Sequence, residues 1–311
     1  MRSRERRNLP LQLFMLPAII LIAVYLYYPI INTLYLSFFE IRNFNIDQRV
    51  FIGLTNYIKL FKDPTFWLAF RNTVLIASAT IFVQMPIAFL LADFLSNHIR
   101  KKHPHLEVWL LLALFFPIVL PTPVLAKSWR LFFVGLQGVG FGPFEWITLK
   151  LGLTNLVTSF FKTKTVLLLQ ELNTALWVVI AIQTWARIGF NLLIYRSAIL
   201  SITSEIYESA EMDGAGPWTK LFYITTPLAR NVISVTIILA IIGVFQLFDM
   251  IWMLTNQGQP LGTTQVLSTY MYTRSFIDLR TGYGSSIAIT ILVTAVVLSL
   301  IQRLFFRVSK Q

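Results

Sequence analysis

The sequence predicts an all-α membrane protein with six transmembrane helices. Hydrophobic residues make up 56% of the 311 positions and charged residues only 13%, whereas about a quarter of the residues in soluble domains are charged. A helix needs about 20 apolar residues to cross the hydrocarbon core, and inside a bilayer its backbone polar groups are satisfied within the helix itself. Segments of this length are found at 12–38, 70–95, 107–132, 175–200, 231–254 and 285–306.

The first apolar segment follows a basic head and resembles a secretory signal at first sight. Its apolar run extends from Leu11 to about Phe39. This is longer than the roughly 7–15 residues of a signal core, and no small-residue cleavage site follows it. We therefore expect a retained first span, with residues 1–11 as a basic cytoplasmic N-terminus and residues 12–311 as one six-span transmembrane domain.

Short basic runs at the span ends predict the orientation. With an even number of spans the runs all fall on one side, and short loops rich in Lys and Arg face the cytoplasm. Both termini are therefore expected in the cytoplasm, although the longer opposite loops also hold basic residues. The runs comprise Arg2, Arg4, Arg6, Arg7, Arg100, Lys101, Lys102, Arg303, Arg307 and Lys310.

Two connecting regions depart from simple spans. The prolines Pro117, Pro121 and Pro123 are expected to break or bend the third span near its far end. The glycine-rich stretch 133–174 is expected to be an outer excursion with little regular structure. Between spans one and two, apolar residues recur at helical spacing, namely Leu54, Tyr57, Ile58 and Phe61. They predict either a short helix in the outer interface or a plain loop.

One compact polar segment, "EIYESAEMDGAGPWTKLFYITTPLAR" from Glu205 to Arg230, separates spans four and five. Ser204 is a candidate N-cap, and Glu205 in the first turn suits the helix dipole. Gly214 and the following Gly216-Pro217 pair should end the helix. Because a helix of about ten residues is marginal alone in water, it needs its own chain or a partner to pack on.

This segment resembles the Glu-Ala-Ala loop of ABC-importer permeases. The family pattern is Glu-Ala-Ala, three residues, Gly, nine residues and then Ile-x-Leu-Pro. The same spacing occurs here in Glu208-Ser209-Ala210, Gly214 and Ile224-Thr225-Thr226-Pro227. Ser209 and Thr226 depart from the pattern, but both are small or medium residues that should preserve docking.

The resemblance extends over nearly the whole chain. Segments such as "FIGLTNYIKLFKDPTFWLAFRNT", "TWARIGFNLLIY" and "FQLFDMIWMLTNQGQP" are similar to carbohydrate-type permeases of the binding-protein-dependent class. Within that class they are more similar to the subunit type represented by the larger membrane subunit of the maltose transporter or by the first glycerol-phosphate permease subunit. The resemblance implies the type I permease fold of ABC importers, with a cytoplasmic coupling helix between spans four and five (coupling loop 203–230).

The resemblance also implies the partners. It predicts half of a heterodimeric pore for a sugar or sugar-like solute, in a bacterial or archaeal inner membrane. A second permease subunit, two cytosolic ATP-binding subunits and an extracytoplasmic solute-binding protein would complete the transporter. No cofactor is expected, and the sequence has no Gly-x-x-x-x-Gly-Lys-Ser/Thr loop, so ATP hydrolysis is expected in a separate subunit. The residues that the resemblance assigns to ATPase coupling are Glu208, Ser209, Ala210, Asp213, Gly214 and Pro227.

Polar residues inside the spans are candidates for solute contact, because they are costly in hydrocarbon. Gln183, Arg187 and Asn191 share one helix face at a spacing of four. By resemblance, the middle of spans four and five lines the sugar site. The alternative is that Arg187 pairs with Asp249, or with the second subunit, to hold helices together. The candidate solute residues are Gln183, Arg187, Phe190, Asn191, Phe245, Gln246 and Asp249.

Two other classes of protein deserve comparison. A secondary transporter driven by an ion gradient should carry acidic relay residues in mid-membrane, and only Asp249 is available. An intramembrane protease needs paired aspartates or His-Glu-x-x-His, and neither pattern occurs. The sequence has no cysteine, and no metal site is expected from the charged-loop histidines His98, His103 and His105.

Overall fold

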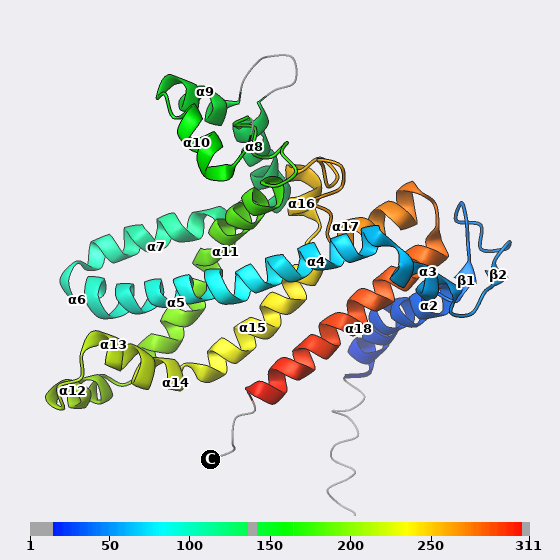
Figure 1. Cartoon of the computed structure of the whole chain (residues 1–311). Helices are drawn as coiled ribbons and strands as arrows, with labels where there is room; N and C mark the ends of the chain where they lie inside the picture. The colour runs from blue at the N-terminus through cyan, green and yellow to red at the C-terminus, as the bar shows by residue number, and fades with distance from the viewer. Residues whose placement is uncertain (1–14, 136–141, 164, 307–311) are drawn as a thin grey trace, which may run out of the picture. The chain divides into compact units, whose positions relative to one another are not determined.

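The structure is a computed structural model that describes residues 15–135, 142–163 and 165–306 (Figure 1). The predicted N-terminus 1–11, the first residues of span one, and Arg307 and Lys310 lie outside these ranges. The chain divides into two compact units, one of residues 1–64 and 271–293, the other of residues 65–270 and 294–311. We describe each unit by itself.

The first unit joins the ends of two membrane helices through a small cap. The helix Met15–Leu36 ends in α2 (Tyr28–Leu36). Strand β1 (Phe39–Glu40) then pairs antiparallel with β2 (Val50–Phe51), and α3 (Thr55–Lys62) follows. The later part of the unit holds the π-helical turn η5 (Thr273–Ile277) and the start of α18 (Thr281–Phe305).

Two close contacts hold this cap together. The buried Asn56 side chain of α3 donates to the carbonyls of Ser37 and Phe39, at 2.9 and 3.0 Å. On α18, a Cβ atom at Gly282 would clash with the Phe39 carbonyl oxygen. Only glycine allows the first turn of α18 to come this close to β1, so the strand and the helix are locked to one another.

The second unit is a helical assembly around one central helix, α11 (Ala175–Leu200). In Figure 1, α11 runs from the α8 end to the α12 end of the unit, passing α5 and α7. The other elements are the continuous helix α4–η2–α5–η3 (Pro64–Ile99), α6 (Arg100–Lys102), α7 (Pro104–Val119), α8 (Thr122–Val134), α9 (Pro143–Lys150), α10 (Thr154–Phe161), α12 (Ser204–Met212), α13 (Pro217–Lys220), η4 (Leu221–Thr225), α14 (Thr226–Leu228), α15 (Arg230–Phe245), α16 (Asp249–Leu254) and α17 (Leu267–Tyr272).

Two apolar clusters meet along α11. Near one end of α11, Leu192 and Tyr195 pack with Phe89 of α5, and the Phe89 and Tyr195 rings meet edge-on at 5.4 Å. Near the other end, Val179 packs with residues of α8 and α16 such as Ile251. Burial of such side chains contributes about 1.5–3 kcal/mol each in water. Inside a bilayer, close packing replaces that driving force.

The membrane spans largely follow the prediction. Four described helices are long and apolar enough to cross a membrane, and there are six if each of two bent helix pairs counts as one span. The predicted spans 175–200 and 285–306 coincide with α11 and α18 to within a few residues. The predicted span 70–95 lies inside the longer helix Pro64–Ile99.

The predicted break in the third span is present, but it lies near the middle of the span rather than near its far end. Helices α7 and α8 meet at a bend of 97° at Leu120 and Pro121. Proline lacks the N–H that would continue the helix, and its ring disfavours a helical residue before it. Leu120 accordingly has extended backbone angles of −73° and 135°.

The fifth predicted span, 231–254, is wrong as one continuous helix. Helix α15 ends at Phe245, and α16 begins only at Asp249. The carbonyl of Leu247 in the gap accepts a hydrogen bond from the Ser268 hydroxyl at 2.5 Å. A distant segment therefore satisfies a carbonyl that the helix leaves unpaired. The spacing of apolar residues in the sequence does not predict this hydrogen bond.

Three smaller expectations were also settled. The segment that follows Leu54 forms a helix, α3 (Thr55–Lys62), rather than a plain loop. The expectation of little regular structure in 133–174 is wrong where α9 and α10 form, because Gly142-Pro143 begins a helix instead of marking a loop. The N-cap before α12 is Thr203 rather than Ser204, since Thr203 has extended backbone angles and Ser204 is already helical.

Candidate functional site

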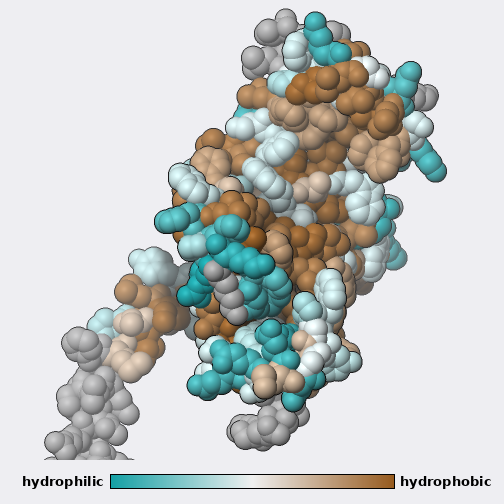
Figure 2. Space-filling view, turned by 90° about the vertical axis from the view of Figure 1, so that its left-hand side faces the viewer, coloured by the Kyte–Doolittle hydropathy of each residue, from teal (hydrophilic) through white to brown (hydrophobic). Residues whose placement is uncertain are grey.

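The segment between α11 and α15 presents a short helix that its own chain does not cover. Helix α12 buries none of its residues, and Met212 is 89% exposed. Figure 2 shows hydrophilic side chains gathered towards the end of this unit that carries α12, below a broad apolar surface. Of the predicted coupling residues, Ala210 is half-buried, and the others are exposed: Glu208, Ser209, Asp213, Gly214 and Pro227.

The C-terminus of α12 is a complete Schellman motif. The Gly214 N–H donates to the Glu211 carbonyl at 3.0 Å, and the Ala215 N–H donates to the Ala210 carbonyl at 2.8 Å. Gly214 has a φ of +80°, a left-handed conformation that glycine adopts without steric cost. The predicted helix end at Gly214 is therefore confirmed, and its geometry explains why glycine is needed there.

Side-chain contacts anchor α12 to the following segment. The Tyr207 hydroxyl lies 3.0 Å from the Thr225 hydroxyl, and Lys220 Nζ lies 2.9 Å from Glu211 Oε2. Burial raises the pKa of the Tyr207 hydroxyl, so this group stays neutral and able to hydrogen-bond at physiological pH. These contacts fix the position of a helix that buries no residue of its own.

A second site is a polar cavity of about 60 Å³ between η2, α11 and α15. The predicted stripe on α11 lies along it, with Gln183 and Asn191 buried and Arg187 exposed. Phe190, also predicted, is a further wall residue. Four of the seven candidate solute residues thus come together around one cavity.

The same cavity includes polar residues that the sequence reasoning missed. Thr80, Gln84 and Thr236 line it. Gln84 is only 1% exposed, and its amide nitrogen has no hydrogen-bond partner within the described chain. The signal was available in the sequence, since an amide side chain in the middle of an apolar span is a functional candidate by default.

The remaining candidates lie away from this cavity. Phe245 is buried at the end of α15, while Gln246 and Asp249 are exposed on either side of the break that follows. Among the described residues, no ion pair joins Arg187 to Asp249. The alternative that these two residues pair to hold the helices together therefore finds no support within the chain.

Known proteins resemble this chain along nearly its full length. The family of binding-protein-dependent transport system inner membrane components matches residues 64–309. The chain is 32% identical over 300 residues to the probable ABC transporter permease protein YurN of Bacillus subtilis (strain 168), covering 96% of each chain. It is 30% identical over 301 residues to the lactose transport system permease protein LacF of Rhizobium radiobacter, covering 93% of this chain and 91% of LacF.

The fold also matches a solved transporter. One chain in a crystal structure of a bacterial ABC transporter involved in the import of the acidic polysaccharide alginate superposes with a TM-score of 0.81 and 24% identity, covering 100% of both chains. The predicted permease fold is thereby confirmed, and the family match sets aside an ion-driven secondary transporter. The chain belongs to the family of binding-protein-dependent transport system inner membrane components and is a membrane-spanning permease of an ABC importer.

Proposed function

We propose that this permease forms half of a heterodimeric pore for a sugar or sugar-like solute. An extracytoplasmic binding protein would deliver the solute, and a separate cytosolic ATPase would bind α12. The chain would sit in a bacterial or archaeal inner membrane with both termini in the cytoplasm. A similar chain, at a TM-score of 0.77 and 23% identity, occurs in an alginate ABC transporter in complex with alginate pentasaccharide-bound periplasmic protein. This supports the same kind of partner for the present chain.

One observation carries the coupling role of α12. A nine-residue helix is marginal alone in water, yet α12 is closed by a full Schellman motif while burying none of its residues. Glu208 and Asp213 are exposed on it, as expected for residues that meet basic groups of a partner. The half-buried Ala210 leaves room for close approach. A solvated connector would need neither the Schellman motif at its end nor the contacts that Tyr207 and Glu211 make with the following segment.

The solute class is supported by the cavity and by the relatives. Relatives are named for transport of lactose, of arabinooligosaccharides and of sulfoquinovosyl glycerol, which all carry several hydroxyl groups. Hydroxyl groups donate to and accept from amide side chains, such as those of Gln84, Gln183 and Asn191. The cavity in this chain is too small for a sugar ring, so the second subunit would have to complete the site.

Co-purification in mild detergent tests this function directly. We expect the tagged chain to bring down an ATP-binding protein and one second, related permease, both identified by mass spectrometry. Glu208→Lys should weaken ATPase recovery through like-charge repulsion, whereas Glu205→Lys, the same change outside the matched motif, should weaken it less. Recovery of the chain alone, or of only a second copy of itself, would contradict the heterodimer. Equal ATPase recovery with both variants would contradict the role of Glu208.

A further inference from the structure

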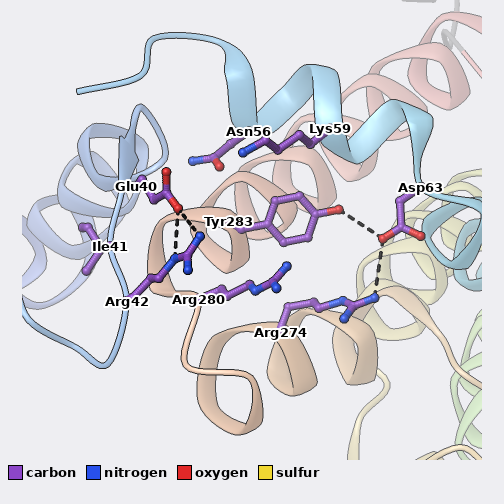
Figure 3. Close-up of a pocket in the computed structure, with 9 residues that line it drawn as sticks. All are labelled: Glu40, Ile41, Arg42, Asn56, Lys59, Asp63, Arg274, Arg280 and Tyr283. Atoms are coloured by element: carbon purple, nitrogen blue, oxygen red, sulfur yellow. Dashed lines mark hydrogen bonds and ion pairs between the residues drawn. The ribbon is translucent and has the colours of Figure 1, made fainter. Parts of the chain in front are cut away.

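The first unit contains a cationic cavity that the transport function does not use. It has a volume of about 210 Å³, several times the roughly 30 Å³ that one water takes up in the liquid. Four cationic side chains face it against two carboxylates (Figure 3). These six residues are Glu40, Arg42, Lys59, Asp63, Arg274 and Arg280.

Both carboxylates of the cavity are already engaged. Glu40 Oε1 accepts hydrogen bonds from Nε and Nη2 of Arg42, at 2.9 and 2.6 Å. Asp63 Oδ2 accepts one from the Tyr283 hydroxyl at 3.3 Å and lies 3.5 Å from Arg274 Nη2. Arg42 thus pairs with Glu40, whereas Arg274 is shared between Asp63 and Asp278, whose Oδ2 lies 2.7 Å from Arg274 Nη1.

Two positive charges remain over the same cavity. Lys59 on α3 and Arg280 just before α18 both line it (Figure 3). Within the described chain, neither side chain has an ion pair or a hydrogen bond. Charge-assisted hydrogen bonds to a phosphate or carboxylate are about twice as strong as neutral ones. The cavity is thus suited to bind an oxyanion between Lys59 and Arg280.

The cavity lies where two membrane helices end. The helix Met15–Leu36 ends four residues before Glu40, and the helix Thr281–Phe305 begins directly after Arg280. Both helices are long and apolar enough to cross a membrane. The ends of such helices lie at the level of the lipid headgroups, where Lys and Arg side chains reach the interface.

Exposed apolar side chains occur on two elements that also contribute residues to the cavity. Leu54, directly before α3, shares one helix face with Ile58 and Phe61, and the three are 62%, 55% and 51% exposed. This face is turned away from the one that carries Asn56 and Lys59. On η5, Phe276 and Ile277 are 53% and 50% exposed. An amphipathic helix of this kind places its apolar stripe at the headgroup–acyl boundary. The apolar stripe therefore places α3 at the membrane surface, and the two unpaired cations call for an anionic ligand at that level.

We propose that this cavity binds the phosphate of an anionic phospholipid, with Lys59 and Arg280 as its ligands. The headgroup of such a lipid lies at the level where the two membrane helices end. A free phosphate offers the same chemistry to Lys59 and Arg280, and the experiment distinguishes these two sources. Binding of an acidic side chain from a docking protein would not explain why the cavity lies at the level of the membrane surface.

Native mass spectrometry of the full chain, purified with its co-assembling subunits, tests the proposal. We would compare phosphatidylglycerol with phosphatidylcholine in mixed micelles. The wild type should retain phosphatidylglycerol preferentially, on the order of tenfold, as expected for one or two charge-assisted hydrogen bonds. The double variant Lys59→Gln, Arg280→Gln should lose this preference. Lys62→Gln removes an exposed charge from α3 outside the cavity and should keep it.

Other outcomes would overturn the lipid site. Equal retention of the two lipids by the wild type would do so. So would inorganic phosphate raising the Tm in phosphatidylcholine micelles as much as phosphatidylglycerol does. A double variant that keeps its lipid preference but loses stimulation by the binding protein would point to a protein-docking site instead. The single variant Lys59→Arg keeps the positive charge and should keep the lipid preference. This control separates the loss of a binding charge from misfolding of the variant.

Discussion

At the scale of single residues, Gln84 combines burial with an unmet hydrogen-bond donor. Its side chain is 1% exposed and faces the cavity of Gln183 and Asn191, yet its amide nitrogen has no partner in the described chain. A buried donor without a partner costs about 1–3 kcal/mol. A group of this kind persists where a ligand supplies the missing acceptor, and a sugar hydroxyl could do so.

Replacing Gln84 with leucine should therefore separate stability from transport. We expect Gln84→Leu to keep or raise the free energy of unfolding, by up to about 2 kcal/mol, because the unmet donor disappears. Solute uptake at limiting concentration should fall at the same time. Thermal unfolding in detergent and uptake into proteoliposomes measure the two effects. Wild-type uptake by this variant would exclude Gln84 from the site.

A matched pair of amides tests where the solute site lies. Gln183 lines the cavity, whereas Gln246 lies exposed beyond the end of α15. We expect Gln183→Ala to weaken apparent solute affinity by about fivefold to tenfold, the worth of one hydrogen bond. Gln246→Ala should have the smaller effect. The reverse order, measured from the concentration dependence of uptake, would move the site to the outer end of span five.

At the scale of secondary-structure elements, two helices owe their placement to specific terminal contacts. Helix α12 is closed by the left-handed Gly214. The start of α7 is tied to α11 by an ion pair between Glu107 Oε1 and Arg196 Nη2 at 2.6 Å, with side chains that are 5% and 24% exposed. Both contacts lie towards the end of the second unit that carries α12 (Figure 1).

The cap of α12 should be required for coupling rather than for membrane insertion. Gly214→Asp places a side chain at a φ of +80°. This costs about 1 kcal/mol of stability at the helix end, which lowers the ratio of formed to frayed helix end about fivefold. We expect uptake to fall while the amount of protein in the membrane is unchanged. Gly216→Ala is the control, since Gly216 has a φ of −70°. Normal uptake by Gly214→Asp would count against the coupling role.

Removing one member of the ion pair between α7 and α11 should lower the free energy of unfolding more than removing both members. Glu107→Gln leaves the partly buried Arg196 charge uncompensated and should lower the free energy of unfolding by about 3 kcal/mol. Adding Arg196→Gln should recover much of that loss, because no charge is left unmatched. Thermal unfolding of the two single variants and the double variant gives the coupling energy. Additive losses would show that the pair contributes little.

At the scale of the whole molecule, the proposed orientation makes a simple prediction. The chain contains no cysteine, so an introduced cysteine is a unique label. Ser209→Cys on α12 and Lys150→Cys on α9 are both exposed positions. An impermeant maleimide should label Lys150→Cys from outside the cell and Ser209→Cys only in inside-out vesicles from which the ATP-binding subunits have been removed. The opposite pattern would invert the topology deduced from the basic loops.

The sequence alone determined the fold class and most of the spans. Long apolar runs have few stable alternatives to helices in a bilayer, so α11 and α18 could be placed to within a few residues. Local backbone chemistry likewise fixed the bend at Pro121 and the helix end at Gly214, because proline lacks a donor and glycine tolerates positive φ.

Only the tertiary structure decided where distant segments meet. The break after Phe245 is matched by a hydrogen bond from Ser268 to the Leu247 carbonyl, and Gln84 joins Gln183 across two helices that are far apart in the chain. The cationic cavity likewise brings Lys59 next to Arg280. Such contacts depend on how the helices pack against one another. The period of hydrophobic residues along one helix indicates which face packs, but not which distant residues that face meets.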